Sequence, residues 1–211
     1  MTGETKRERR LAARDTRKQR AAEARKRAAI GRTAAIVIAV ALVAVLTVAA
    51  FTTSFFGLMT APIGRAMPLG KADHVAEGTP IEYSSRPPTS GPHFAAWYPS
   101  YGVVEQPVPV GNWVHNLEHG AIVVLYNCPT GCPDLVAQLK ELHADLPKGR
   151  NARGGVARML AVPHADMDQR IAVTSWGRLL ELDQYDAGQI QRFYEAYIDR
   201  GPECQNLTCP P

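Results

Sequence analysis

The longest stretch of this chain without a charged residue runs from Thr33 to Gly64, and it separates a basic N-terminal segment from a mildly acidic remainder. Residues 1–32 contain twelve Lys/Arg and four Asp/Glu, a net charge of +8, whereas residues 33–211 contain twelve and sixteen, a net charge of −4. The apolar core of the stretch, Ala34–Phe56, has the roughly 20 residues that a helix needs to cross about 30 Å of hydrocarbon. The sequence therefore predicts one transmembrane helix over residues 33–56.

The flanking charges predict the orientation of this helix. Twelve Lys/Arg precede it, and only Arg65 and Lys71 follow within about 20 residues, so the positive-inside bias places residues 1–32 in the cytoplasm. A cleaved signal peptide would have a short basic region and about 7–15 apolar residues, and both segments are longer here. We predict a single-pass integral protein of the cell membrane, with its C-terminal domain outside. That domain has no basic excess, so we predict no nucleic-acid partner. A second protein of the same membrane is the partner that this location suggests.

The residues after this helix form three segments that differ in composition and periodicity. Breaker residues without periodicity in residues 57–72 predict a tether. Residues 73–211 are enough for one domain with its own core. Within it, residues 73–113 are rich in Pro, Gly, Ser and aromatic residues and show no sustained period, which predicts ordered loops. From Gly120 onward the pattern is regular, and we predict an α+β fold, a small mixed sheet with two main helices.

The regular part follows the order strand, helix, strand, strand, strand, helix. Apolar and β-branched runs predict strands at Ala121–Tyr126, Val156–Val162, Ile171–Trp176 and Arg178–Leu182. Pro133, followed by leucines spaced four, three and four residues apart up to Leu146, predicts the first helix. Asp186 as cap, with Gln189 completing a capping box, predicts the second helix, which Gly201 ends. This order implies one parallel pair across the first helix and antiparallel strands after it.

Histidines are concentrated in two short motifs, PPTSGPH, which ends at His93, and HNLEHG, which begins at His115. On a helical turn His115, Glu118 and His119 would share one face, with Cβ atoms about 5–6 Å apart. Two imidazoles and a carboxylate suit zinc, copper or iron. We predict that such a turn and the proline-rich loop together hold a divalent transition metal, zinc or copper. The predicted metal ligands are His93, His115, His119, Glu118 and His74.

Asn112 could cap the helical turn and Gly120 could end it. The alternative is structural: the imidazoles hydrogen-bond backbone groups of residues 87–93 and fix that loop against residues 113–120. An extended strand would instead separate His115 and His119 by about 13 Å, too far to share one ion.

The residues from His115 to His119 also match H-x-x-E-H, the motif of one class of zinc peptidases. A peptidase would hold this motif within a long helix, whereas Gly120 and the strand-like run AIVVLY follow it immediately. We therefore assign no catalytic residue and favour a protein that is not an enzyme.

The four cysteines form two local pairs, Cys128 with Cys132 and Cys204 with Cys209. In an exported domain an even number of cysteines predicts disulfides, and we expect these two. Because Cys128 and Cys132 lie between a strand and a helix N-terminus, a redox-active thiol pair is the alternative. Their three-residue spacing differs from the two residues of the thioredoxin-like motif, which favours the structural disulfide.

Four segments together resemble a known family: PPTSGPH at 87–93, HNLEHGAIVVLY at 115–126, TSWGRLLELD at 174–183 and FYEAYIDRGPE at 193–203. They are similar to membrane-anchored bacterial proteins catalogued as domain of unknown function 3105. The resemblance covers nearly all of residues 73–203 and implies no established activity. It implies that the family's His-rich signature blocks contain His74, His93, His115, Glu118 and His119.

Three functions are consistent with these patterns. The first is a metal-binding or metal-handling module outside the membrane. The second is an interaction subunit whose ordered loops contact a membrane partner, and the third is a metal- or thiol-dependent enzyme. Because imidazoles bind metal only when neutral, a metal site of the first kind would lose affinity as the pH falls through about 6.5.

The topology is directly testable. A fluorescent protein that matures only in the cytoplasm, fused after Pro211, should remain dark because the fusion point is predicted to be exported. The same reporter fused before residue 1 serves as the control and should fluoresce. Fluorescence from the C-terminal fusion would contradict the predicted orientation.

Overall fold

A computed structural model describes residues 17–20, 23, 25–27, 31–32, 38–51, 62–148, 155–204 and 209. The chain divides into two compact units, Met1–Ala61 and Pro62–Pro211. In the first unit residues 38–51 are helical, and among the described residues no helix is long and apolar enough to cross a membrane. The predicted cytoplasmic tail, residues 1–32, and the predicted transmembrane helix, residues 33–56, lie partly outside the described residues. Membrane anchoring therefore stays a prediction.

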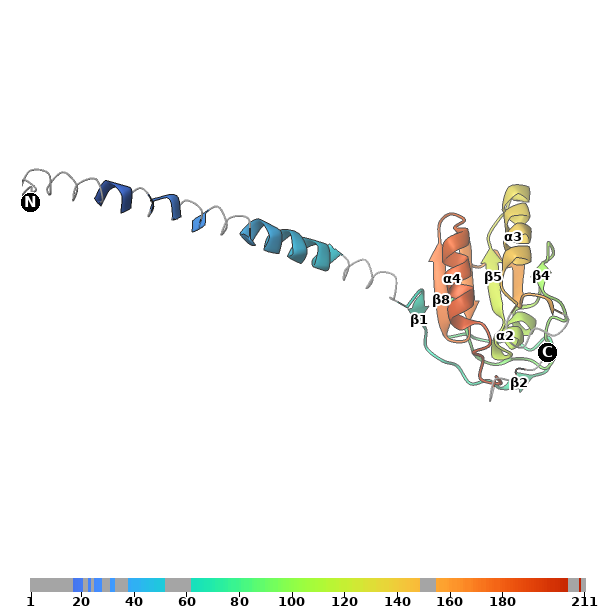
Figure 1. The fold of residues 1–211 in the computed structure, drawn as a ribbon. Helices are drawn as coiled ribbons and strands as arrows, with labels where there is room; N and C mark the ends of the chain where they lie inside the picture. Colours follow the sequence, from blue (N-terminus) through green and yellow to red (C-terminus); the bar gives the residue numbers. More distant parts are fainter. Residues whose placement is uncertain are drawn as a thin grey trace, which may run out of the picture. The chain divides into compact units, whose positions relative to one another are not determined.

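The second unit is an α+β fold built on a mixed six-stranded sheet (Figure 1). The sheet order is β1-β8-β7-β5-β6-β4. Its strands are β1 (Arg65–Ala66), β4 (Gly102–Val103), β5 (Ile122–Tyr126), β6 (Met159–Pro163), β7 (Ile171–Ser175) and β8 (Arg178–Leu182). β6 is parallel to β5 and to β4, whereas the pairs β5–β7, β7–β8 and β1–β8 are antiparallel. The predicted parallel pair and the antiparallel strands after it are confirmed.

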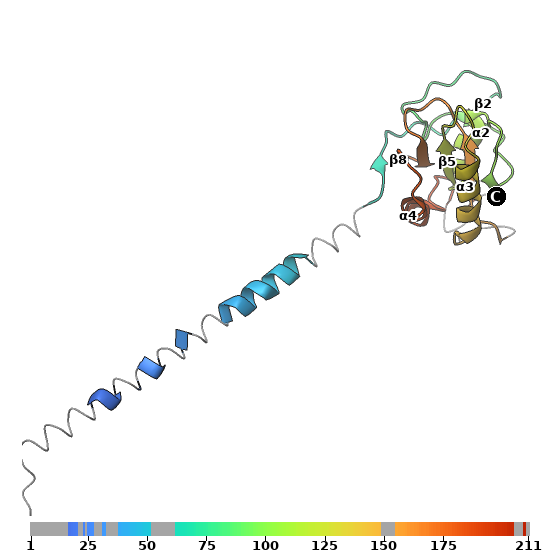
Figure 2. The same cartoon turned by 90° about the horizontal axis from the view of Figure 1, so that it is seen from above.

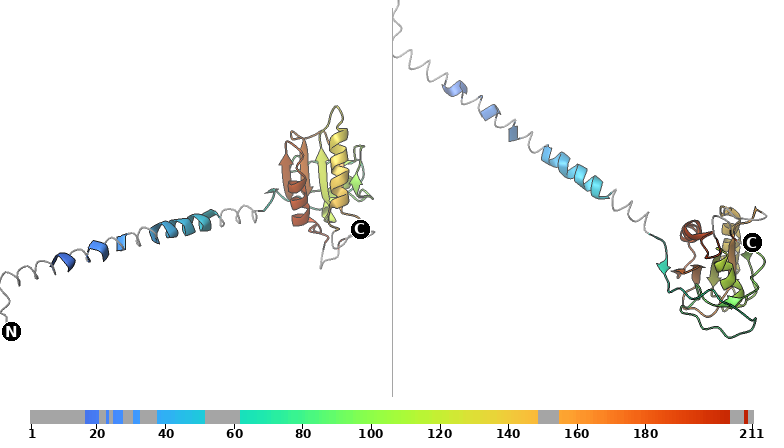
Figure 3. Two further views of the ribbon diagram at one scale, coloured as in Figure 1. Left: turned by 45° about the horizontal axis from the view of Figure 1, so that its top comes forward. Right: turned by 90° about the horizontal axis from the view of Figure 1, so that it is seen from below.

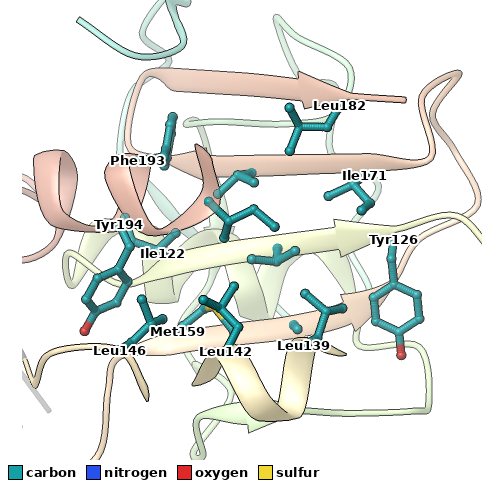
Figure 4. Close-up of a cluster of buried hydrophobic side chains, with 14 of the residues drawn as sticks. Ile122, Tyr126, Leu139, Leu142, Leu146, Met159, Ile171, Leu182, Phe193 and Tyr194 are labelled. Atoms are coloured by element: carbon teal, nitrogen blue, oxygen red, sulfur yellow. The ribbon is translucent and has the colours of Figure 1, made fainter. Parts of the chain in front are cut away.

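Two helices cover one face of the sheet, and Figures 1 and 3 show them side by side. They are α3 (Pro133–Asp145) and α4 (Ala187–Tyr197). The leucine stripe of α3 and the apolar face of α4 pack on alternate residues of the strands, and Figure 4 shows this core. Burial of this core supplies most of the driving force for folding, at roughly 25 cal/mol per Å² of apolar surface removed from water.

A third helix, α2 (Val110–Glu118), covers the opposite face, as the view along the sheet in Figure 2 shows. Its Trp113, Val114 and Leu117 are fully buried against the other set of alternate strand residues. Because both faces are covered, all five residues of β5 are buried, as a continuous apolar run predicts. The helix that the sequence suggested only as a turn is thus one of the principal elements of the fold.

The ends of α4 differ in part from the sequence prediction. Asp186 is the cap, and its carboxylate accepts hydrogen bonds from the backbone N–H of Gln189 at 2.9 Å and from the Gln189 side chain at 2.9 Å. The helix ends at Tyr197, earlier than the predicted stop at Gly201. Asp199 adopts a left-handed backbone conformation, φ 58°, so the chain has already turned before Gly201.

Two predictions about the N-terminal half of the unit are wrong in detail. The folded unit begins at Pro62, so residues 62–72 are not simply a tether, because β1 pairs with β8. Residues 73–113, predicted as loops, contain β4 and a second, two-stranded sheet of β2 (His74–Val75) and β3 (His93–Phe94). Strands of two residues are too short to produce a periodic pattern in the sequence.

Both predicted disulfides are present in the structure, Cys128–Cys132 and Cys204–Cys209. The first follows β5 and includes Cys132, the cap residue of α3. The second follows the segment of residues 199–204, which packs on the C-terminal end of α2.

Gly201 provides a test of that packing. A Cβ atom added to Gly201 would collide with the carbonyl oxygen of Glu118 at the end of α2, a backbone atom that cannot rotate away. Gly201→Ala should therefore lower the free energy of unfolding by about 1–3 kcal/mol, measured by denaturant titration. Gly188→Ala, in the open first turn of α4, is the control and should be neutral or stabilising by about 0.5–1 kcal/mol. Equal stability of the two variants would contradict this packing.

Candidate metal centre

The HNLEHG motif forms the C-terminal half of α2 and the turn after it, and each position has a distinct role. Leu117 packs in the core. The side chain of Asn116 holds the neighbouring loop: it donates to the carbonyl of Tyr98 and accepts from the N–H of Tyr98, both at 2.9 Å. Gly120 has φ +81°, which lets the chain turn directly into β5. The remaining positions are the ionisable ones, and they face the loops that cover α2.

The predicted cap of this helix is wrong. The residue before α2 is Pro109, and no side chain caps the helix. Asn112 lies within the first turn, where its amide donates to the carbonyl of Ala96 at 2.7 Å. Asn112 and Asn116 thus both fasten residues 96–98, and so fix the backbone of Trp97 beside the helix.

The PPTSGPH loop is held rigidly where it delivers His93. β3 runs parallel to β2 with His93 opposite His74, and the N–H of His93 donates to the carbonyl of Asp73 at 3.0 Å. The loop backbone is close to the preceding segment, since a Cβ atom on Gly70 would lie 2.6 Å from the Cα of Gly91. The pairing therefore places two imidazoles side by side above α2.

Three imidazoles surround one carboxylate, and we call His74, His93, His115 and Glu118 the inner cluster. The Glu118 Oε2 atom lies 2.8 Å from Nε2 of His93, 3.6 Å from Nε2 of His74 and 3.9 Å from Nε2 of His115. One ligand atom from each residue lies within 4.8 Å of every other. His93, His115 and Glu118 are buried, whereas the His74 side chain is 47% exposed.

Backbone carbonyls fix the protons of the two buried imidazoles. His93 Nδ1 lies 2.9 Å from the carbonyl oxygen of Gly91, and His115 Nδ1 lies 2.7 Å from that of Phe94. A carbonyl only accepts, so each Nδ1 carries a proton and donates it. This leaves Nε2 as the available ligand atom, an arrangement usual for histidines that bind metals.

Burial keeps His115 neutral. Burial is the largest cause that lowers its pKa to about 4, and the neighbouring imidazoles of His119, His93 and His74 lower it further. The hydrogen bond to the Phe94 carbonyl acts in the opposite direction but is the weaker effect. At neutral pH His115 therefore offers an unprotonated nitrogen, the form that metals bind.

The contact between His93 and Glu118 is unusual. Among the described residues neither His93 Nε2 nor Glu118 Oε2 has a hydrogen-bond partner, although both are buried and they lie only 2.8 Å apart. With a proton on Nδ1, the contact is either an ion pair with a doubly protonated imidazole or, for a neutral ring, two lone pairs that face each other. The contact of two lone pairs is unfavourable unless a cation compensates it.

A transition-metal ion fits this arrangement. Bonds of about 2.0–2.2 Å around a tetrahedral ion place neighbouring ligand atoms roughly 3.4 Å apart. The three distances from Glu118 Oε2, from 2.8 to 3.9 Å, bracket that value. The inner cluster thus contains four of the five predicted ligands.

His119, the fifth, belongs to a different group. It lies beside His115, with ring centroids 4.4 Å apart, but its Nε2 pairs with Oε2 of Glu203 at 3.1 Å. His115, His119 and Glu203 form a second possible metal-binding group, which we call the outer group. The sequence prediction did not include Glu203, although it closes the FYEAYIDRGPE segment. The predicted convergence of His93, His115 and His119 on one point is thus wrong for His119.

Two tryptophans flank these groups. Trp97 contacts both groups, with ring centroids 5.6 Å from His115 and 5.1 Å from His119, and it is partly exposed. Trp176 meets His93 edge to face at 6.1 Å. Trp113, by contrast, points into the core. Aromatic rings therefore contact imidazoles of both groups.

A separate cavity of about 280 Å³ lies nearby, and Phe94 and Gly111 contribute to its lining. The hydroxyl of Tyr83 and Nε2 of His164 in its lining are buried and have no partner among the described residues. Burial raises the pKa of Tyr83 to about 12 and lowers that of His164. These two groups are therefore neutral, and the cavity lacks the cluster of imidazoles and carboxylate that distinguishes the inner cluster.

The fold and the site together define a small α+β domain with a cluster of three histidines and one glutamate, all buried except His74, that is able to hold a metal ion. The chain belongs to the family described as "Protein of unknown function (DUF3105)", which matches residues 74–210. The family resemblance expected from the four motifs is confirmed. No curated protein and no solved structure matches the chain.

Glu118→Gln separates a metal-binding role from a structural one. Without metal, the substitution removes a buried charge and supplies an amide donor for His93 Nε2, so the free energy of unfolding should rise by about 1–3 kcal/mol. The stabilisation by added Zn²⁺ should fall at the same time. Both are measured by denaturant titration with and without Zn²⁺, with Glu195→Gln on the exposed face of α4 as control. A metal-free variant less stable than the wild type would favour the structural role.

Proposed function

We propose that this protein is a metal-binding module, which holds one divalent transition-metal ion in the inner cluster and is anchored in the cell membrane with this domain outside. The observation that carries the proposal is the buried contact between His93 Nε2 and Glu118 Oε2, at 2.8 Å without a hydrogen bond. A cation at that point turns an unfavourable contact into two coordinate bonds. It also compensates the buried carboxylate of Glu118, beside which the His115 ring is neutral at pH 7 because its pKa is lowered to about 4.

A purely structural role for the histidines explains less. In that role the imidazoles would satisfy both nitrogens with backbone or side-chain groups. His93 and His115 satisfy Nδ1 in this way, and each turns Nε2 toward the same carboxylate. The arrangement therefore prepares one ligand atom from each ring.

The donor set narrows the metal. Three imidazoles and a carboxylate are borderline-to-hard ligands that suit Zn²⁺, Cu²⁺ and Fe²⁺. Soft Cu⁺ prefers thiolates and thioethers, and all four cysteines are in disulfides. We propose Zn²⁺ or Cu²⁺.

The location outside the membrane rests on the charge asymmetry across residues 33–56 and on cysteine usage. Two disulfides in one small domain are typical of an oxidising compartment and rare in the cytosol. Both arguments support the same side of the membrane, and they use different residues.

The second candidate is a non-catalytic interaction subunit of a membrane complex. Two exposed side chains favour it, Leu69 at 69% and Trp97 at 39%, since large apolar side chains left in water often mark contact surfaces. A peptidase is not supported by the local structure, because the H-x-x-E-H motif lies at the end of the nine-residue helix α2, with β5 directly after it, and not within a long helix.

Metal content tests the proposal. The purified protein should contain close to one Zn²⁺ or Cu²⁺ per chain by elemental analysis, and His93→Ala and His115→Ala should lose it. Adding the metal at about 100 times its Kd should stabilise the metal-free wild type by roughly 2.7 kcal/mol. His143→Ala is the control, because His143 lies on α3, contacts the carbonyl of Ala157 and belongs to neither group. No bound metal and no stabilisation would leave the interaction subunit as the better explanation.

A further inference from the structure

The outer group is built as firmly as the inner cluster. His119 is buried, with a side chain only 4% exposed, and Glu203 Oε2 lies 3.1 Å from its Nε2. The carbonyl of His119 accepts a hydrogen bond from the buried guanidinium of Arg158 at 2.6 Å. The same guanidinium forms an ion pair with Asp199 at 2.9 Å. Arg158 thus links the backbone of His119 to Asp199, at the start of the segment that follows α4.

Glu203 is positioned by the segment that follows α4. The N–H of Asp199 donates to the carbonyl of Gly120 at 2.9 Å, and the N–H of Glu203 approaches the carbonyl of Glu118 at 3.3 Å. The absence of a side chain at Gly201 allows this close approach. The disulfide from Cys204 to Cys209 follows immediately. These contacts bring a carboxylate from the C-terminal part of the chain to the end of α2.

The two groups share a single nitrogen. His115 uses Nδ1 to donate to the carbonyl of Phe94, so only its Nε2 is free, and one Nε2 binds one ion. An ion with the full inner set leaves the outer group with only His119 and Glu203. An ion with the full outer set takes His115 away from the inner cluster.

We infer that one metal ion has two alternative positions in this domain, and that it passes between the inner cluster and the outer group through His115. This inference rests on the proposed function. Both groups meet solvent, through His74 in the inner cluster (47% exposed) and Glu203 in the outer group (39% exposed), but only the outer group presents an exposed carboxylate, which attracts a cation from solvent. The outer group captures and releases the ion, which is held more firmly by the four ligands inside.

Exchange kinetics distinguish this arrangement from a single static site. Substitution of a residue that lies only on the path of the ion changes the rates of capture and release by the same factor. The affinity of the inner cluster then stays almost unchanged. The probe is Cu²⁺ alone, which binds N and O ligands more tightly than other divalent first-row ions. Quenching of tryptophan fluorescence reports capture, since Trp97 contacts both His115 and His119. Transfer to EDTA reports release.

In the full-length protein, Glu203→Gln should slow both capture and release about tenfold, equivalent to about 1.4 kcal/mol in the barrier. The equilibrium Kd should change less than about twofold, and the stoichiometry should stay at one. Glu203→Asp, which keeps the charge but withdraws the carboxylate from His119, should slow exchange as well. Glu195→Gln is the charge-matched control on α4 and should leave the rates unchanged.

Each contrary result has a distinct meaning. Two Cu²⁺ ions per chain, or unchanged rates in Glu203→Gln, would overturn the two-position inference and leave a metal site in the inner cluster. A rate change in Glu195→Gln as large as in Glu203→Gln would reduce the effect to general charge attraction and would also overturn it. No Cu²⁺ binding by the wild type would overturn the proposed function itself.

Discussion

The burial of the Glu118 carboxylate is the constraint on which the arrangement of the inner cluster depends. A carboxylate removed from water is costly unless a positive charge or hydrogen-bond donors compensate it. The nearest groups are imidazole nitrogens, and the pKa of His115, lowered to about 4, shows that one of them adds no charge at neutral pH. The carboxylate thus supplies the negative charge, and the neutral ring of His115 supplies a lone pair directed at the same point.

The rest of the fold keeps this charge in place. α2 is fixed by Trp113, Val114 and Leu117 on the sheet, which leaves little freedom to Glu118 one residue further on. Asn112 and Asn116 fasten residues 96–98 to the opposite side of the helix. Because ligands on a rigid helix cannot relax toward other partners, an unfavourable arrangement in the metal-free protein persists instead of collapsing.

Long periodic segments explain most of what the sequence could predict. β5 to β8 and both helices on their face have continuous apolar runs or apolar residues at helical spacing, and their order alone implies the parallel pair β5–β6. The helical part of the inner cluster was predictable for a similar reason. His115 and Glu118 are three residues apart on one helix, so local geometry brings them together without knowledge of the tertiary fold.

Contacts between distant segments explain what could not be predicted. β1 and β4 have two residues each, and their partners in β8 and β6 are far away in the sequence. The same holds for Glu203, one acidic residue among many, which reaches His119 only because the chain after α4 turns back to α2. The HNLEHG motif therefore predicts which of its residues are ligands. It does not predict which of them belong to the inner cluster and which to the outer group.

That division has a physical basis in the helix itself. Neighbouring residues on a helix point about 100° apart, so Glu118 and His119 cannot both face the same loop, whereas His115 lies close to each of them. Glu118 faces the segment with His93, and His119 faces the segment with Glu203. Among the described residues, His115 is the metal ligand that belongs to both groups, with ring centroids 4.8 Å from His93 and 4.4 Å from His119. A nitrogen shared in this way limits the two sets to one complete coordination at a time.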